Sequence, residues 1–105
     1  MGLAVAVALY PQKSAAEEFT GTEFLTWQTD AQVNYVRIAE ATATIVATRT
    51  NPAEATCLDD WFASTPEATT AGTTELLETI GRNTDYHPGA VIVVALERQC
   101  GSFKG

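Results

Sequence analysis

The chain has 105 residues, a length that suits one domain. Thirteen acidic residues against six basic ones give a formal net charge of −7. Nucleic acids are bound through clusters of Lys and Arg, so this balance argues against a nucleic-acid partner. It favours a protein partner, in particular a basic one that long-range attraction would steer, although acidity by itself also serves solubility.

Residues 1–16 have features of an export signal. Residues 2–10 are apolar, and Ser14-Ala15-Ala16 forms a small-x-small cleavage site before Glu17. The apolar run is too short for a bilayer, which needs about 20 residues. We therefore expect a partial signal peptide over 1–16, a single helical domain over 17–105, and a periplasmic or secreted location without a membrane span. The alternative is that this segment is an N-terminal strand or helix of the mature domain.

The chain contains two cysteines, Cys57 and Cys100. In the oxidising compartment that an exported chain meets, such a pair normally closes into a disulfide. For a loop of this length the chain-entropy model gives a stabilisation of about 4 kcal/mol. Two cysteines this far apart, with one histidine, supply too few ligands for a structural zinc site.

A short apolar turn is expected at Phe24, Leu25 and Trp27, followed by a long helix. Asp30 is the expected N-cap of that helix, which should run to about Thr48. Its apolar stripe is expected to face the core, with Glu40 on the remaining surface. The stripe consists of Ala31, Tyr35, Ile38, Thr42, Ile45 and Val46.

Asn51-Pro52 predicts the start of a second helix, because Asn caps free amides and Pro fits the first helical position. This helix should run to Ser64 and end before Pro66. Its apolar face is expected to hold Cys57, Leu58, Trp61 and Phe62, with Glu54, Asp59 and Asp60 outside. Residues 65–74 are interpreted as a loop. A third helix, capped by Thr73 or Thr74, follows with Leu76, Leu77 and Ile80 on one side.

His87-Pro88 opens the last element, over residues 89–100. Its run from Ala90 to Leu96 is apolar all round and would also suit a buried strand. The proline start and Gly101 at the far end favour a central helix. The expected fold is therefore an all-α, compact bundle of about four helices closed by one disulfide, Cys57–Cys100.

The sequence offers little chemistry for catalysis, so we expect no enzyme activity and no metal or other cofactor. His87 is the single histidine and is more consistent with a structural role at a helix start. Asp59-Asp60 point in different directions on a helix, which disfavours a metal site with Asp85 and His87. The candidate partner-binding residues are Trp27, Tyr35, Trp61 and Tyr86, together with Asp59 and Asp60.

Several short motifs carry a family resemblance. These are Cys57-Leu58, Leu76-Leu77-x-x-Ile80, His87-Pro88-x-Ala90, the apolar run from Val91 to Leu96, and Cys100. Over about residues 20–103 the chain resembles the Rap/Tai family of small periplasmic immunity proteins. The additional cysteine pair of that family is absent. The resemblance implies a protein that docks on a secreted toxic enzyme and blocks it.

A second similarity is to HdeA-type acid-stress chaperones. Glu23-Phe24-Leu25 is similar to the opening of that family's first helix, with Thr22 where the family has a cysteine. This similarity implies a protein that loosens in acid and holds unfolding client proteins. The two hypotheses call for different partners, a basic secreted enzyme or an unfolding client. A homodimer is compatible with both.

Overall fold

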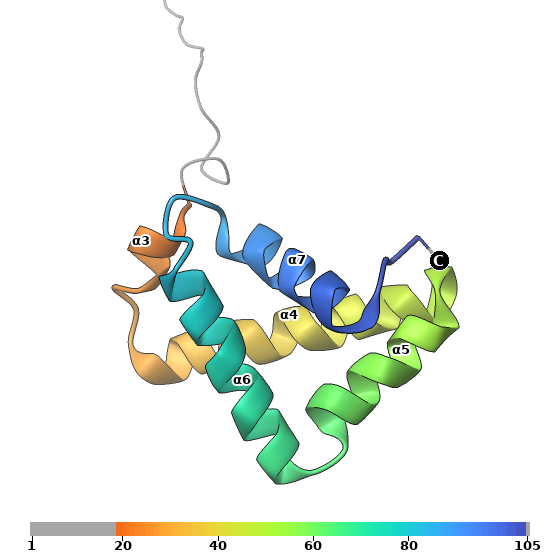
Figure 1. Cartoon of the computed structure of the whole chain (residues 1–105). Coiled ribbons are helices and arrows are strands. Elements are labelled where there is room, and N and C mark those ends of the chain that lie inside the picture. Colours follow the sequence, from red (N-terminus) through yellow and green to blue (C-terminus); the bar gives the residue numbers. More distant parts are fainter. Residues whose placement is uncertain (1–18, 105) are drawn as a thin grey trace, which may run out of the picture.

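The computed structural model describes residues 19–104, and the regular structure in that range is helical (Figure 1). The elements in chain order are α3 (Gly21–Phe24), α4 (Thr29–Thr50), α5 (Pro52–Leu58), the π-helical turn η1 (Asp59–Ala63), α6 (Pro66–Gly81) and α7 (Pro88–Cys100). Because η1 continues α5, these residues form four main helices and one short one. The expected all-α bundle is confirmed, whereas the expected signal peptide at 1–16 lies outside the described residues.

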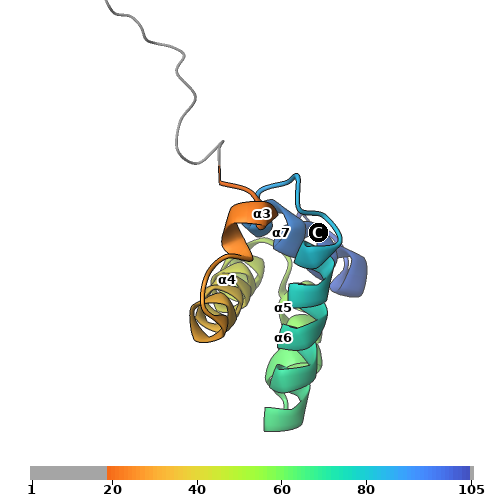
Figure 2. The same ribbon diagram turned by 90° about the vertical axis from the view of Figure 1, so that its left-hand side faces the viewer.

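The helices surround a core to which each main element contributes. α7 packs against α4, α5 and α6, and Figure 2 shows α4 along one side of the molecule with α5 and α6 on the other. The buried cluster consists of Phe24, Val36, Leu58, Phe62, Leu76, Ile80, Val91, Ile92 and Leu96. Within residues 19–104, none of the helices is long and apolar enough to cross a membrane.

The disulfide between Cys57 and Cys100 is present, with the two Cα atoms 5.7 Å apart. It joins the last turn of α7 to α5. Just beyond it, the Asn51 side chain donates to the Ser102 carbonyl (2.7 Å), and the Phe103 amide donates to the Glu97 carboxylate (3.3 Å). The C-terminal turn is thereby held against the start of α5.

Three prolines stand at the starts of helices, and one of them was interpreted wrongly from the sequence. The second helix ends at Ala63, before Pro66 as predicted, but Pro66 itself begins α6, so the predicted loop over 65–74 and the predicted cap at Thr73 or Thr74 are wrong. The Thr65 hydroxyl caps this helix by accepting from the Ala68 amide (3.0 Å). Proline is tolerated here because a first-turn residue has no helical partner for its missing N–H.

The other helix ends lie close to their predicted positions. α4 begins at Thr29, one residue before the expected cap, and Asp30 lies in its first turn, where a negative charge suits the helix dipole. Asn51 precedes α5 as predicted, but its side chain makes no cap bond. His87 caps α7 through Nδ1, which accepts from the Gly89 amide (3.0 Å). Gly101 ends α7 at φ 102°, a conformation that favours glycine.

The orientation of α4 differs from the prediction. The stripe expected to face the core is largely exposed, with Ile38 67% and Ile45 66% accessible. The inner stripe, defined as Val36, Glu40, Ala43 and Ala47, is buried or half-buried instead. Ala43 and Ala47 on this stripe allow α4 to approach its neighbours closely.

α7 packs against α4, α5 and α6 as expected of a central helix, but it is not buried on every face. Val91, Ile92 and Leu96 are buried, but Val93 and Val94 are 42% and 47% exposed. The apolar run therefore covers the core with one face only. Its outward valines border two grooves, one on each side of α7.

Candidate functional site

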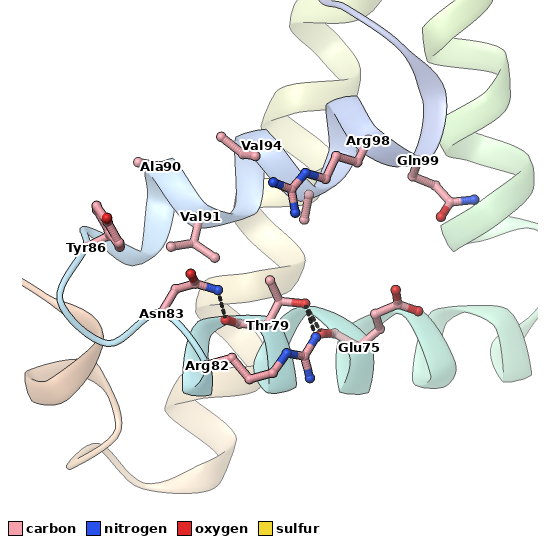
Figure 3. A pocket seen from close by; sticks show the side chains of 11 residues that line it. Glu75, Thr79, Arg82, Asn83, Tyr86, Ala90, Val91, Val94, Arg98 and Gln99 are labelled. Carbon is pink, nitrogen blue, oxygen red and sulfur yellow. Dashed lines mark hydrogen bonds between the residues drawn. The ribbon is translucent and has the colours of Figure 1, made fainter.

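A groove of about 450 Å³ runs between α6 and α7. Figure 3 shows α6 as one wall and α7 as the other, with Tyr86 near the start of α7 and Gln99 toward its end. The lining residues are Glu75, Thr79, Arg82 and Asn83 on the α6 side, Tyr86 in the connecting loop, and Ala90, Val91, Val94, Ala95, Arg98 and Gln99 on α7. The two walls differ in chemistry.

The α6 wall is polar and internally hydrogen-bonded. An Arg82 Nη donates to the Thr79 hydroxyl (3.3 Å), which in turn donates to the Glu75 carbonyl (2.8 Å). The Asn83 side-chain amide donates to the Thr79 carbonyl (2.8 Å). These bonds fix the end of α6 and leave further guanidinium N–H groups of Arg82 available for a ligand.

The α7 wall is apolar along its first turns and charged at its end. Figure 3 shows the Arg98 side chain running back along α7 toward Val94, on the α7 wall of the groove. Tyr86 is 63% exposed at the opposite end. Of the five basic residues after position 16, two line this groove, although the chain as a whole is acidic. The site can therefore bury an apolar side chain while arginine binds a carbonyl or carboxylate oxygen.

A second groove, of about 660 Å³, lies on the other side of α7 and is almost entirely apolar. It is lined by Tyr35, Ile38, Ala39, Thr42, Ala43 and Val46 of α4, by Gly89, Val93 and Glu97 of α7, and by Phe103 and Lys104. Its charged groups, Glu97 and Lys104, both come from the C-terminal side of α7. The geometry suits an apolar partner surface and offers little for orienting a small polar ligand.

An aromatic cluster closes one end of the molecule. Trp27 stacks on Phe19 with ring centroids 5.3 Å apart, and Tyr35 contacts both rings edge-on. The His87 ring also meets Phe19, at 5.2 Å. Burial raises the pKa of Tyr35, and the Gly89 backbone partly opposes this effect by hydrogen bonding. The cluster fixes His87 in its capping role.

Two glutamates that were expected on the surface are buried. Glu40 is 4% exposed, and its carboxylate accepts from the Thr44 hydroxyl (3.0 Å). Burial raises its pKa, with a smaller contribution from the negative charge of Asp59. Glu54 is 1% exposed, and neither carboxylate oxygen has a hydrogen-bond partner. Burial raises the pKa of Glu54 as well, and nearby Glu97 adds to the shift.

The structure does not bring the six predicted binding residues together. Trp27 and Tyr35 meet in the aromatic cluster, and Tyr86 lies in the α6–α7 groove. Trp61 is half-buried against the core beside Phe62, in the π-helical turn that also carries the exposed Asp59 and Asp60. The candidates therefore fall on three separate parts of the surface.

Of the residues that line the two grooves, the sequence predicted Tyr86 and Tyr35 as partner-binding but missed the arginines. Arg82 and Arg98 were not singled out because they are isolated in sequence and line one groove only because α6 packs on α7. The exposed stripe of α4 could have been recognised from the sequence, because the inner stripe on the same helix also contains small apolar residues at helical spacing. A helix with two apolar stripes can bury one of them in the core, and the other is then left on the surface.

Within residues 19–104, no group of three or more His, Cys, Asp or Glu side chains is placed to hold a metal ion. Comparison with protein-family models, with curated proteins and with solved structures finds no match to this chain.

Proposed function

We propose that this chain is a non-enzymatic protein-binding protein whose α6–α7 groove holds a segment of its partner. The observation that carries the proposal is the grouping of exposed Tyr86 and Val94 with Arg82 and Arg98 in one groove. Tyrosine and arginine are enriched among residues that dominate binding energy, particularly where they flank a desolvated apolar centre. The segment that fits has an apolar side chain flanked by carbonyl or carboxylate oxygens.

The charge of the remaining surface supports a partner that is basic overall. Formal net charge is −7, so attraction at long range would speed association with a cationic protein. In its specific form the proposal is an immunity-type role, in which the bound partner is a secreted toxic enzyme and binding blocks its active site. The resemblance of the Cys57, His87-Pro88 and Cys100 motifs to periplasmic immunity proteins supports this form.

The acid-stress chaperone alternative requires a fold that loosens as pH falls. Glu40 and Glu54 act in the opposite direction, because their raised pKa values mean that the folded state binds protons more tightly than the unfolded chain does. Light scattering of an aggregating client at pH between 2 and 3 separates the two functions. We expect no suppression by this protein, whereas suppression would favour the chaperone.

The binding proposal is tested with groove variants. The tagged chain and the variants Tyr86→Ala and Arg98→Glu are used to capture proteins from the producing organism, with Arg37→Glu, an exposed arginine on α4, as the matched charge control. A groove partner is retained by the parent and by Arg37→Glu and is lost, or at least about tenfold weaker, with the groove variants. The captured protein is then assayed for enzymatic activity with and without this chain.

Each result has a distinct consequence. Inhibition of a captured enzyme by the parent chain, relieved by Arg98→Glu, supports the immunity-type role. A partner whose activity is unchanged by binding contradicts that role and leaves a binding protein of another kind. If neither groove substitution changes how much partner is captured, the binding site lies elsewhere and the assignment of the groove is overturned.

A further inference from the structure

α4 carries a second, largely exposed stripe, of which only Tyr35 packs against other elements among residues 19–104, through the aromatic cluster. This outer stripe consists of Ala31, Tyr35, Ile38, Thr42, Ile45 and Arg49, on the side of the helix opposite the inner stripe. Ile38 and Ile45 have the highest exposed fractions of the large apolar side chains in the described chain, 67% and 66%. Side chains of this size standing in line on a helix mark an interaction surface.

The spacing of the outer stripe identifies the kind of partner. Successive members are separated by four, three, four, three and four positions, the alternation that defines the a and d positions of a heptad repeat. Such a seam fits another helix lying nearly parallel or antiparallel to α4. The apolar α4–α7 groove lies alongside it and adds Val46 and Val93 to the surface.

The same stripe is complementary to itself in the antiparallel orientation. Antiparallel helices pair an a position with a d position of the other chain. That rule places Tyr35 opposite Ile45 of the partner subunit and Thr42 opposite Ile38 of the partner subunit. It also places Arg49 opposite Ala31 of the partner subunit. Each pair then occurs twice about a two-fold axis near the middle of α4, as an isologous dimer requires.

The charges of α4 fit this arrangement. Between Asp30 in the first turn and Arg49 in the last, the outer stripe carries no charged residue. In the antiparallel pair Arg49 lies beside Asp30 of the partner subunit, at both ends of the interface. A parallel pair would instead place the two Arg49 side chains together. Opposite charges at the ends of an apolar seam therefore specify the antiparallel orientation.

We propose that the chain forms an antiparallel homodimer through the outer stripe of α4. This dimer leaves the α6–α7 groove, on the other side of α7, open in each protomer, so it does not depend on the proposed function. The seam spans about 27 Å of helix at 1.5 Å per residue.

Sedimentation velocity of the full chain over a wide range of concentration tests the proposal. The parent chain should shift from monomer to dimer as concentration rises, and Ile38→Lys should weaken self-association by at least about tenfold. Because Ile38 is 67% exposed, the variant should remain folded, which circular dichroism checks. Arg37→Glu, off the stripe on the same helix, should dimerise like the parent.

A charge exchange tests the orientation. Arg49→Glu and Asp30→Arg should each weaken the dimer, and the double variant should recover it, because the exchanged pair again has opposite signs. Recovery would not occur in a parallel dimer. A parent chain that stays monomeric at every concentration overturns the proposal and leaves the stripe to a different protein. A dimer that Ile38→Lys does not weaken also overturns it.

Discussion

At the scale of single residues, the two buried glutamates govern how stability responds to pH. Glu54 has the less favourable environment, because its carboxylate lies inside the protein without a hydrogen-bond partner and near Glu97. Burial of a charge disfavours the ionised form, and a second negative charge adds to that effect. At neutral pH both effects act against the folded state.

The sign of the pH dependence follows from the raised pKa. The stabilising effect of protonating Glu54 is fully present below its ordinary pKa of 4.5 and is lost as pH rises through the higher pKa of the folded protein. Glu40 acts in the same direction. We predict that the free energy of unfolding, measured by urea titration, is larger at pH 5 than at pH 7. A protein that is less stable at pH 5 would contradict this assignment.

Replacing the carboxylate isolates the contribution of one residue. Glu54→Gln should stabilise the protein at pH 7 by on the order of 1 kcal/mol, since it removes a buried charge and leaves a neutral polar group. Below pH 4.5 the gain should disappear, because Glu54 of the parent is then protonated. Glu78→Gln, an exposed site on α6, serves as the control and should show little change at either pH. A gain that persists in acid would point to packing instead of charge.

At the scale of elements, the contact between α6 and η1 depends on a glycine. A Cβ atom at Gly72 would lie 2.7 Å from Cδ2 of Phe62, whose ring is buried in the core. Alanine normally improves a helix interior by about 1 kcal/mol over glycine, but overpacking a core costs about 1–3 kcal/mol. Gly72 is therefore explained by close approach of two elements.

We predict that Gly72→Ala lowers the free energy of unfolding by about 1 kcal/mol, because overpacking outweighs the gain in helix propensity. Gly81→Ala, at the end of the same helix with no atom within 4 Å of the added carbon, should be neutral or slightly stabilising. Urea titration of both variants provides the comparison. If Gly72→Ala were as stable as Gly81→Ala, the ring of Phe62 could not be packed on α6 as described.

The sequence predicted the positions of the helices better than it predicted which face of each helix is buried. Proline starts and caps located α5 and α7, and the apolar positions Leu58, Phe62, Leu76 and Ile80 lie in the core as expected. Pro66 was misinterpreted because proline both ends and begins helices, and only the Thr65 cap bond distinguishes the two. The local pattern specifies where a helix lies but not which side it buries.

α4 shows the physical reason for this limit. Both of its stripes have helical spacing, and the choice between them depends on packing against helices that are distant in sequence. The inner stripe contains alanines, which permit close approach, and a glutamate, which no hydrophobicity rule would place inside. The candidate grooves were missed for the same reason, because each is formed by two helices and neither wall is recognisable alone.

At the scale of the whole molecule, the disulfide joins α5 to the end of α7, two helices that also pack against each other. Cys57 and Cys100 are 43 positions apart, and the loop that they close contains η1, α6 and most of α7. In the chain-entropy model a closed loop of this length stabilises the folded state by about 4 kcal/mol, mainly by restricting the unfolded chain. A domain of this size has about 5–15 kcal/mol in total.

We predict that the double variant Cys57→Ala/Cys100→Ala loses about 4 kcal/mol of unfolding free energy, and that the reduced parent loses a similar amount. The measurement is urea titration followed by circular dichroism, with and without reductant. Reductant should not change the variant, which controls for effects of the reagent itself. The bond also holds the end of α7 against α5, so reduction should raise amide exchange at Phe103, whose N–H donates to the Glu97 carboxylate, before the core of α6 opens. Oxidised and reduced proteins of equal stability would show that packing alone closes the bundle.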